Sequence, residues 1–305
     1  MKRVTQTKGV RLKLPATSAN LGPGFDAAGL AMSMHLTVEA HVAPVWQIHA
    51  TGRNADLVGA LENNLVVETF QSVLKAFEVD TPALKLTIHN EIPLGMGCGS
   101  SAAALCAGVA LANHFGSLGW NDAEIVAEAS RREGHPDNVA ACWLGGFTVS
   151  AETEQGVETA TFGKDSTWQM LLAVQATSLA TKKARALLPD TYSKADAVFN
   201  VQRMSLLVSA FAANRLDLLR AGMADRIHQP YRQDACPLLK SLLPLASEPE
   251  IAGVALSGAG PSVLLVLNEG TTLLAAETRV SGLVGTEVEM IPVNVAGGAE
   301  VLVLQ

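Results

Sequence analysis

Aromatic and charged side chains are both scarce in this 305-residue chain: aromatic residues make up 5% of it and charged residues 17%. Intrinsic disorder is disfavoured, because a disordered chain combines low hydrophobicity with high net charge, whereas 49% of these residues are hydrophobic. The length suits two compact domains better than one. We therefore expect small and branched aliphatic side chains to form the cores of two domains.

An excess of positive charge is also missing, since the formal net charge is −7. A protein that binds nucleic acid needs a basic face for the phosphate backbone, so the sequence argues against a nucleic-acid partner. A nucleotide substrate stays compatible with this charge, because backbone amides can hold phosphates on an acidic protein.

Cysteine pairs and long hydrophobic runs are absent as well. Four cysteines are spread along the chain without a C-x-x-C pair: Cys98, Cys106, Cys142 and Cys236. This spacing suggests neither a disulfide framework nor a zinc site and fits a reducing compartment. The longest apolar runs, 102–112 and 263–267, are too short to span a membrane, and the basic N-terminus lacks the apolar block of a signal peptide. We expect a cytoplasmic protein without a membrane partner.

Hydrophobic periodicity predicts alternating strands and helices. Strands are predicted at 10–14, 30–45, 46–51, 84–89, 170–175, 251–256, 263–267 and 287–293. Helices are predicted at 63–77, 101–115, 121–134, 182–188, 195–220 and 273–284, the third with Asn121 and Glu124 as a capping box. Pro15 is expected to end the first strand, and 142–148 to lead into a hairpin with an acidic turn at 152–158. The predicted domains are 1–165 and 166–305.

The glycine- and serine-rich stretch PLGMGCGSSAA lies between a predicted strand and a buried helix, where a phosphate would find free N–H groups and the positive end of the helix dipole. Its residues are the candidate nucleotide ligands: Pro93, Leu94, Gly95, Met96, Gly97, Cys98, Gly99, Ser100, Ser101, Ala102 and Ala103. It is neither a Walker A loop, which needs a lysine, nor a dinucleotide fingerprint. A tight turn capped by serine is the alternative.

The stretch PATSANLGPGFD at 15–26 contains Asn20 and Asp26 on a loop stiffened by Pro15 and Pro23. Both side chains are suited to a small polar substrate, and Asp26 to an ammonium group. The alternative is that they only cap turns, as these residue types often do.

The stretch SGAGPS at 257–262 lies between two predicted apolar strands. Its successive amides could form an anion-binding nest that faces the active site. Taken alone, a simple hairpin or crossover turn is the stronger interpretation of this stretch.

These three stretches, in this order, resemble the signature motifs of the GHMP kinases, and within them the homoserine kinase family. EGHPDNVA at 133–140, TKKARALLP at 181–189 and QPYR at 229–232 carry the same resemblance, which spans essentially the full length. Cys98 is a departure, because the family usually has leucine or isoleucine there. We expect its side chain beside the loop rather than on phosphate.

The resemblance implies that ATP phosphorylates the side-chain hydroxyl of L-homoserine, giving O-phospho-L-homoserine for threonine biosynthesis. It implies that Asn20 and Asp26 hold the amino end of the substrate. Arg185 and Arg232 would hold the carboxylate, for which the guanidinium fork is well shaped. An isolated arginine is ordinarily a solvated surface charge, but here two fall within family-like motifs.

The resemblance also implies a reaction without a dedicated base. Thr181, His135 and Asn138 would line the pocket near the hydroxyl, and Asn138 stands where some GHMP kinases have an aspartate base. An amide cannot take the substrate proton, so positioning and charge neutralisation would supply the rate. A lone histidine such as His135 often only holds its own loop.

By resemblance, Mg²⁺ would be bound by Ser101 and a helix glutamate, for which Glu128 is the first choice and Glu133 the alternative. Asn64 is the candidate adenine contact. The implied fold is α+β in two domains, an N-terminal mixed α/β domain that binds ATP and a C-terminal ferredoxin-like domain. Homodimers are common in the family. The rival interpretations are a GHMP kinase for mevalonate or a sugar, and a non-catalytic nucleotide-binding protein on the same fold.

Overall fold

The computed structural model of the chain describes residues 8–175, 181–285 and 287–305, without the side chains of 181 and 182. Its strands are β1 (Val10–Asn20), β2 (Gly24–Val42), β3 (Gln47–Gly52), β4 (Leu84–Asn90), β5 (Phe147–Thr153), β6 (Gly156–Phe162), β7 (Met170–Val174), β8 (Ile251–Leu256), β9 (Val263–Leu267), β10 (Glu289–Val293) and β11 (Glu300–Val303). Its α-helices are α1 (Ala55–Val58), α2 (Leu65–Ala76), α3 (Ser100–Gly116), α4 (Asp122–Glu133), α5 (Asp137–Leu144), α6 (Thr181–Arg185), α7 (Lys194–Ala212), α8 (Leu219–Gly222), α9 (Gln229–Arg232), α10 (Pro237–Leu242) and α11 (Leu273–Val284). Two short 3₁₀ helices, η1 (Leu216–Leu218) and η2 (Leu243–Ser247), complete the described elements.

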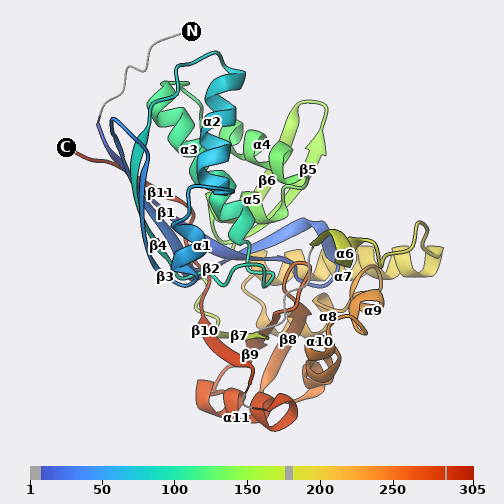
Figure 1. Cartoon of the computed structure of the whole chain (residues 1–305). Coiled ribbons are helices and arrows are strands. Elements are labelled where there is room, and N and C mark those ends of the chain that lie inside the picture. The colour runs from blue at the N-terminus through green and yellow to red at the C-terminus, as the bar shows by residue number, and fades with distance from the viewer. Residues whose placement is uncertain (1–7, 176–180, 286) are drawn as a thin grey trace.

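The N-terminal sheet has the strand order β11-β1-β2-β4-β3, and β5 and β6 extend it from β2. Helices α2 to α5 lie together on one side of this sheet (Figure 1). The alternation of β1 explains its orientation, because Val10, Leu12 and Leu14 are buried and Arg11 is exposed. The apolar helix α3 packs between the sheet and α2, which confirms the expectation of a buried helix.

Local caps set where two of these helices begin. Asn64 precedes α2 and accepts hydrogen bonds from the Val66 and Val67 amides. The predicted capping box of α4 is present: the Asn121 side chain accepts from the Glu124 amide, and Glu124 accepts from the Asn121 amide. Helix α4 ends at Glu133 and is followed by Gly134, whose left-handed φ of 91° suits a residue without a Cβ.

The C-terminal sheet has the antiparallel order β10-β7-β9-β8. Helix α7 lies in the connection from β7 to β8, a turn joins β8 to β9, and α11 connects β9 to β10. A β-α-β-β-α-β order with the fourth strand beside the first is the ferredoxin-like arrangement, so the predicted fold is confirmed. One face of this sheet packs on the main core through Leu172 and Leu264, and the other packs under α10 and α11.

The chain crosses from the first sheet to the second between β6 and β7, where the predicted division at 165/166 lies. It then crosses back, because β11 pairs with β1 in the N-terminal sheet. The end of β11 therefore lies beside the start of β1, with Val303 opposite Val10. Among the described residues, no helix combines the length and apolarity that a membrane crossing requires.

Two strand predictions are wrong in their bounds. Pro15 does not end β1, which continues to Asn20 with a shift of register between Pro15 and Ala16. A proline fits at such an irregularity because it has no N–H to contribute to the ladder. Strand β2 begins at Gly24, earlier than predicted, so most of the stretch 15–26 is strand and only its centre is a turn. The sequence also gave no sign of β11.

Two helix predictions are wrong as well. The predicted helix 195–220 is two segments, because α7 stops at Ala212 and Asn214 takes a left-handed φ of 50°. Residues 142–144, expected to lead into a hairpin, instead form the end of α5, an eight-residue helix that is buried almost all round. Its lack of a polar face removes the periodicity that would reveal it. The hairpin itself follows as β5 and β6.

Candidate active site

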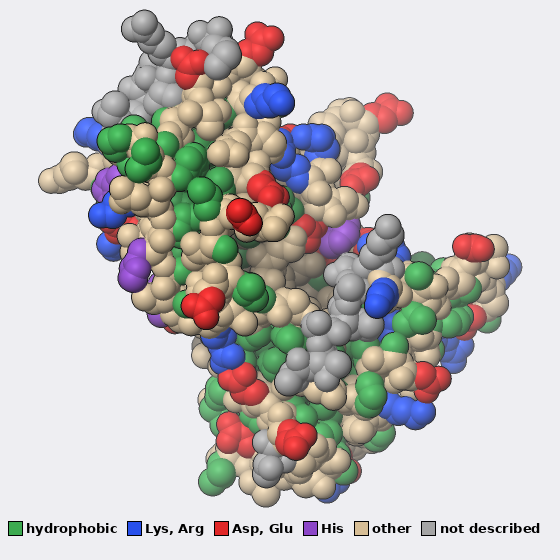
Figure 2. Space-filling view, in the orientation of Figure 1, with side chains coloured by type: hydrophobic (Ala, Val, Ile, Leu, Met, Phe, Trp, Pro, Cys, Tyr) green, Lys and Arg blue, Asp and Glu red, His purple; other side chains and the backbone are tan. Residues whose placement is uncertain are grey.

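A cavity of about 220 Å³ lies where the two sheets meet. The turn between β1 and β2, the loop before α3, the segment before α5, α6, α9 and the β8–β9 loop all contribute to its wall. Figure 2 shows the surface hollowed between the upper and lower parts of the molecule. Most of the motifs singled out in the sequence therefore converge on one place.

The β1–β2 turn presents Asn20 and Asp26 in left-handed backbone conformations, with φ of 70° and 56°. The Asn20 side chain accepts a hydrogen bond from the Asp26 amide at 3.0 Å and donates to the Gly258 carbonyl at 2.9 Å. Asn20 thus does cap its own turn, the alternative reading of the sequence, while also lining the cavity.

The loop before α3 bends at Gly95, Gly97 and Gly99, whose φ values of 70°, 76° and 69° are left-handed. Gly97 also packs so closely on the carbonyl of Ser257 that a Cβ there would collide with it. The Ser257 hydroxyl donates to the Gly97 carbonyl at 2.7 Å. The stretch 257–262 is a turn between antiparallel strands, as the simpler interpretation predicted, and its Gly258, Ala259 and Gly260 line the cavity.

In the described part of the chain, no side chain caps the start of α3, where Gly99 is the N-cap residue. The first N–H groups of this 17-residue helix are therefore left for a ligand at its positive end. Ser100 and Ser101 line the cavity there. Cys98 is buried, and burial raises the pKa of its thiol to about 12, so it stays uncharged beside the loop.

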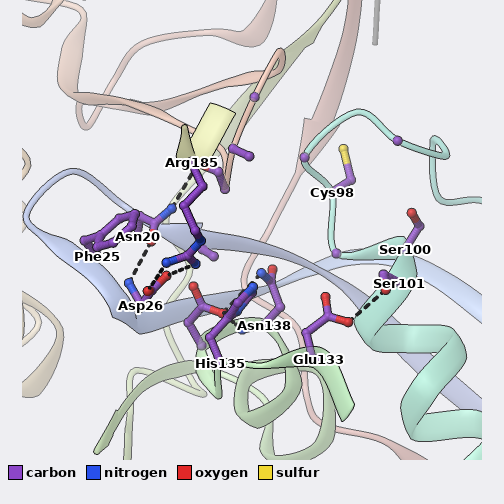
Figure 3. Close-up of a pocket in the computed structure, with 18 of the residues that line it drawn as sticks. Asn20, Phe25, Asp26, Cys98, Ser100, Ser101, Glu133, His135, Asn138 and Arg185 are labelled. Carbon is purple, nitrogen blue, oxygen red and sulfur yellow. Dashed lines mark hydrogen bonds and ion pairs between the residues drawn. The ribbon is translucent and has the colours of Figure 1, made fainter. Parts of the chain in front are cut away.

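A carboxylate lies beside this helix start. Glu133, the last residue of α4, accepts a hydrogen bond from the Ser101 hydroxyl at 2.8 Å and lines the cavity (Figure 3). Burial raises the pKa of Glu133, although the hydrogen bond from Ser101 opposes the shift. Ser101 and Glu133 together form a pair of hard oxygen donors.

The structure does not bring Glu128 to Ser101, which corrects the first choice of metal ligand. The Glu128 carboxylate accepts hydrogen bonds from Arg131 at 2.9 and 3.0 Å and from Arg132 at 2.7 Å. Burial raises the pKa of Glu128, but the two arginines outweigh this effect and lower it overall. Its charge is already neutralised, and the described residues that line the cavity do not include it.

The start of α5 forms a buried hydrogen-bonded group. The Asp137 carboxylate accepts from His135 Nδ1 at 2.5 Å and from the Asn138 amide at 2.7 Å. The Asn138 side-chain oxygen accepts from the Thr17 hydroxyl at 2.7 Å. Thr17 also donates its amide to the Cys98 carbonyl, so it joins Asn138 to the glycine loop.

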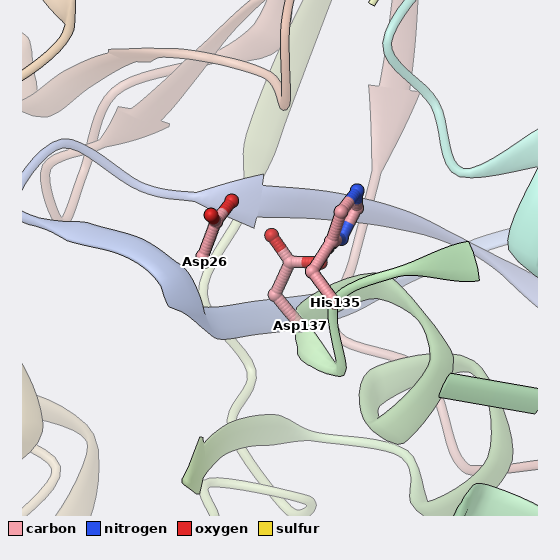
Figure 4. A group of neighbouring side chains, drawn as sticks. All are labelled: Asp26, His135 and Asp137. Carbon is pink, nitrogen blue, oxygen red and sulfur yellow. Dashed lines mark hydrogen bonds and ion pairs between the residues drawn. The ribbon is translucent and has the colours of Figure 1, made fainter. Parts of the chain in front are cut away.

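His135 acquires positive charge readily in this setting. Burial lowers the pKa of His135, but the hydrogen bond and the charge of Asp137 outweigh burial and raise it overall. Asp26, His135 and Asp137 have potential ligand atoms within 4.8 Å of one another (Figure 4). Because Arg185 already occupies both oxygens of Asp26, and His135 binds Asp137, the group is a charge network of these four side chains.

Within this network, Arg185 and Asp26 form a bidentate ion pair. Nη1 and Nη2 of Arg185 donate to the two Asp26 oxygens at 2.7 and 2.8 Å. The guanidinium also lies 5.2 Å from the centre of the Phe25 ring. Figure 3 shows this pair on one side of the cavity and Ser100 and Ser101 on the other, with Asn138 and Glu133 between them.

Arg232 contributes a second guanidinium, and it is almost completely buried, with 2% of its surface exposed. It donates to the carbonyls of Ala184 and Gly258, both at 3.3 Å, and its guanidinium lies 5.4 Å from the Phe25 ring centre. A buried arginine that lines a cavity is a site for an anion, because arginine is rarely buried without a partner.

Asn64 and part of the glycine loop are not among the described residues that line the cavity. Asn64 uses its side chain to cap α2 and to donate to the carbonyls of Val58 and Ala60, both at 2.9 Å. The side chain of Thr181 lies outside the described residues. Among the described lining residues, the glycine-loop members are Gly95, Gly97, Cys98, Gly99, Ser100 and Ser101, without Pro93, Leu94, Met96, Ala102 or Ala103.

Sequence reasoning missed Thr17, Phe25 and Asp137 as members of the site. Phe25 and Asp137 lie inside two of the motifs, next to residues that were singled out, so adjacency was the available signal. Thr17 also lies within a motif, the stretch 15–26, but its neighbours Asn138 and Cys98 are distant in sequence. No local pattern marks that contact.

Known proteins match the chain along its length. The GHMP kinases N terminal domain matches residues 64–146, and the GHMP kinases C terminal domain matches residues 207–281. A homoserine kinase from Solibacter usitatus is 46% identical over 260 residues, which is 85% of each chain. A solved structure from Listeria monocytogenes, provisionally named a homoserine kinase, is 30% identical with a TM-score of 0.76 and covers 96% of this chain and 99% of its own.

The fold is shared beyond these relatives. The mevalonate kinase of L. major, solved with R-mevalonate, has a TM-score of 0.75 at 16% identity, with 97% of this chain and 99% of its own covered. At that identity the likeness concerns the fold alone. The family profiles together with the identity to the Solibacter usitatus protein are sufficient to establish membership: the chain belongs to the GHMP kinases.

Proposed function

We propose that the protein transfers the γ-phosphoryl group of ATP to the side-chain hydroxyl of L-homoserine. The observation that carries this proposal is a single cavity with a phosphate-type helix start on one wall and Asp26, Arg185 and Arg232 on the other. Those three charges complement the ammonium and the carboxylate of an amino acid. The naming of the Solibacter usitatus relative as a homoserine kinase supports the same substrate.

The triphosphate of ATP binds at the glycine loop. The backbone N–H groups at the uncapped start of α3 donate to phosphate oxygens, and the helix dipole favours their negative charge. Gly95, Gly97 and Gly99 let the loop approach the phosphates closely, since they have no side chains to hold the ligand away.

The donor set at this helix start fits Mg²⁺. Glu133 is a half-buried carboxylate with a raised pKa, and it accepts a hydrogen bond from the neutral Ser101 hydroxyl, so a cation beside it would relieve the cost of its burial. Magnesium prefers a few hard oxygen ligands together with water and phosphate. Ser101 and Glu133 would hold the ion, which would neutralise charge on the phosphates when bound.

The charged groups of the substrate replace the ion pair between Asp26 and Arg185. The substrate ammonium takes the Asp26 carboxylate, and the substrate carboxylate takes Arg185 and Arg232. Because both partners of the pair gain a new counter-charge, neither is left unpaired in the complex. A neutral alcohol or sugar offers no such exchange, and a simple anion would leave Asp26 without a partner.

Phosphoryl transfer forms a bond between the homoserine hydroxyl oxygen and the γ-phosphorus, and it breaks the bond from that phosphorus to the β–γ bridging oxygen. Asn138 orients the hydroxyl, because its amide is fixed by Thr17 and Asp137. It cannot take the hydroxyl proton. In a loose transition state this proton is transferred late, to an oxygen of the incoming phosphoryl group or to water, so positioning supplies most of the rate. His135 lines the same cavity.

The decisive experiment measures ADP release from ATP and Mg²⁺ in four parallel reactions, with homoserine, mevalonate, galactose or no acceptor. We expect release with homoserine only. Release with mevalonate or galactose would assign another GHMP acceptor. Nucleotide binding without release in any reaction would identify a non-catalytic binding protein.

A further inference from the structure

The buried guanidinium of Arg232 contacts His228, a side chain that the mechanism above does not use. The Arg232 guanidinium uses Nε to donate to the Ala184 carbonyl, and it uses Nη1 to donate to the Gly258 carbonyl and to contact His228 Nδ1 at 3.1 Å. Among the described residues, none accepts one of these hydrogen bonds from Nη2. The edge that includes Nη2 is therefore the one left for an anion in the cavity.

The contact between His228 and Arg232 fixes the state of the imidazole. A guanidinium has only donors, so Nδ1 of His228 must accept the hydrogen bond and carry no proton. The proton then lies on Nε2, which donates to the Gly22 carbonyl at 2.8 Å. Burial lowers the pKa of this histidine, and the opposing effect of Asp225 does not reverse that shift, which agrees with a neutral ring.

The His228 ring is itself locked in place. It is fully buried, and its centroid lies 5.5 Å from that of Phe25. The Asp225 carboxylate accepts hydrogen bonds from the amides of Ile227, His228 and Gln229 at 2.7 to 3.0 Å. The Asn200 side chain donates to the same carboxylate at 2.8 Å.

We propose that His228 is a positioning residue for the acceptor: its neutral Nδ1 sets the orientation of the Arg232 guanidinium toward the substrate carboxylate, while its Nε2 ties α9 to the β1–β2 turn. The geometry links three parts of the site through one ring, namely Arg232, the turn with Asn20 and Asp26, and the Phe25 face. This role rests on the proposed function, because it assumes that Arg232 binds the carboxylate of homoserine.

Two amide substitutions separate the two nitrogens of His228. In His228→Asn the amide oxygen can replace Nδ1 as the acceptor for Arg232, whereas the donor to Gly22 is lost. In His228→Gln the longer side chain can place its amide nitrogen near Nε2 and keep the donor to Gly22, whereas the acceptor for Arg232 is lost. A ring that serves only packing or loop attachment would make the glutamine variant the better replacement.

The test measures KM and kcat for homoserine and for ATP in the full-length protein and both variants, with thermal melting by circular dichroism as the control for folding. His228→Gln should raise the KM for homoserine roughly ten-fold, as expected for loss of a hydrogen bond to a charged group. The KM for ATP should stay within about two-fold, since the glycine loop lies on the other wall. His228→Asn should give a smaller rise.

A double-variant comparison tests the role even if a single variant has a lowered melting temperature. In an Arg232→Ala background, His228→Asn and His228→Gln should have the same kcat/KM for homoserine, because the acceptor no longer has a guanidinium to orient. An unchanged difference between the variants in that background would overturn the role, as would equal rises in both Michaelis constants. Wild-type protein without homoserine-dependent ADP release would instead overturn the proposed function and this role with it.

Discussion

Asp26→Asn is the substitution that tests the charge recognition most directly. Asparagine has nearly the shape of aspartate and tolerates the left-handed φ of 56° at this position, so the backbone of the turn is retained. What changes is the charge that Arg185 contacts at 2.7 and 2.8 Å in the free protein and that the substrate ammonium contacts in the proposed complex.

Two effects of opposite sign set the expected change in the free energy of homoserine binding. Loss of a charged partner for the ammonium weakens homoserine binding by about 2–3 kcal/mol. The wild-type substrate must also displace the pair between Asp26 and Arg185, whose side chains are 33% and 45% exposed. A pair so exposed contributes at most about 1 kcal/mol, and the variant is spared that loss. Subtracting the full ~1 kcal/mol leaves a net change of about 1–2 kcal/mol, a roughly 5- to 30-fold rise in the KM for homoserine.

The assay is steady-state ADP release with homoserine and ATP varied in turn. Asp217→Asn is the matched control, because Arg215 binds Asp217 in the same bidentate way at 2.7 Å for both bonds, on an open surface. We expect the control to leave both Michaelis constants unchanged. A rise of equal size for ATP and homoserine in Asp26→Asn, or no rise, would refute the assignment of Asp26 to the ammonium.

Two further predictions follow from the carboxylates and the histidine. Glu133→Gln should lower kcat by at least about 100-fold and raise the Mg²⁺ concentration needed for half-maximal activity, whereas Glu128→Gln should leave that concentration unchanged and lower the melting temperature, since it breaks the pairs with Arg131 and Arg132. The reverse pattern would return the metal to Glu128. Because the pKa of His135 is raised in the folded state, its contribution to stability is present below about pH 6.5 and is lost as pH rises through the folded value. The difference in urea midpoint between wild type and His135→Gln should therefore shrink from about pH 6 to pH 9, and a difference that does not depend on pH would contradict this.

Local patterns determined much of this protein from the sequence. The alternation in β1, the capping box of α4 and the apolar helix α3 each depend on residues within a few positions of one another, and all three were predicted. The same holds for the glycine loop, because a backbone that must bend sharply next to a helix start needs glycine in any surroundings. The order of the motifs also indicated the family.

Tertiary structure decided which of two similar residues takes part in the site. Glu128 and Glu133 are five positions apart on α4, so at about 100° per residue their side chains point about 140° apart. One meets two arginines of its own helix and the other meets Ser101. The sequence offered both glutamates, and only the orientation of α4 against α3 separates them.

Long-range pairings were likewise beyond the sequence. Thr17 reaches Asn138, β11 returns to β1, and Asp26 pairs with Arg185, each across more than a hundred residues. Hydrophobic periodicity and capping preferences describe interactions along the chain, so they contain no information on which distant segments meet. The sequence by itself determined the elements, the loop chemistry and the charges available for a substrate. The packing of the two sheets decided which of those charges face one another across the cavity, because that packing places segments from both ends of the chain side by side.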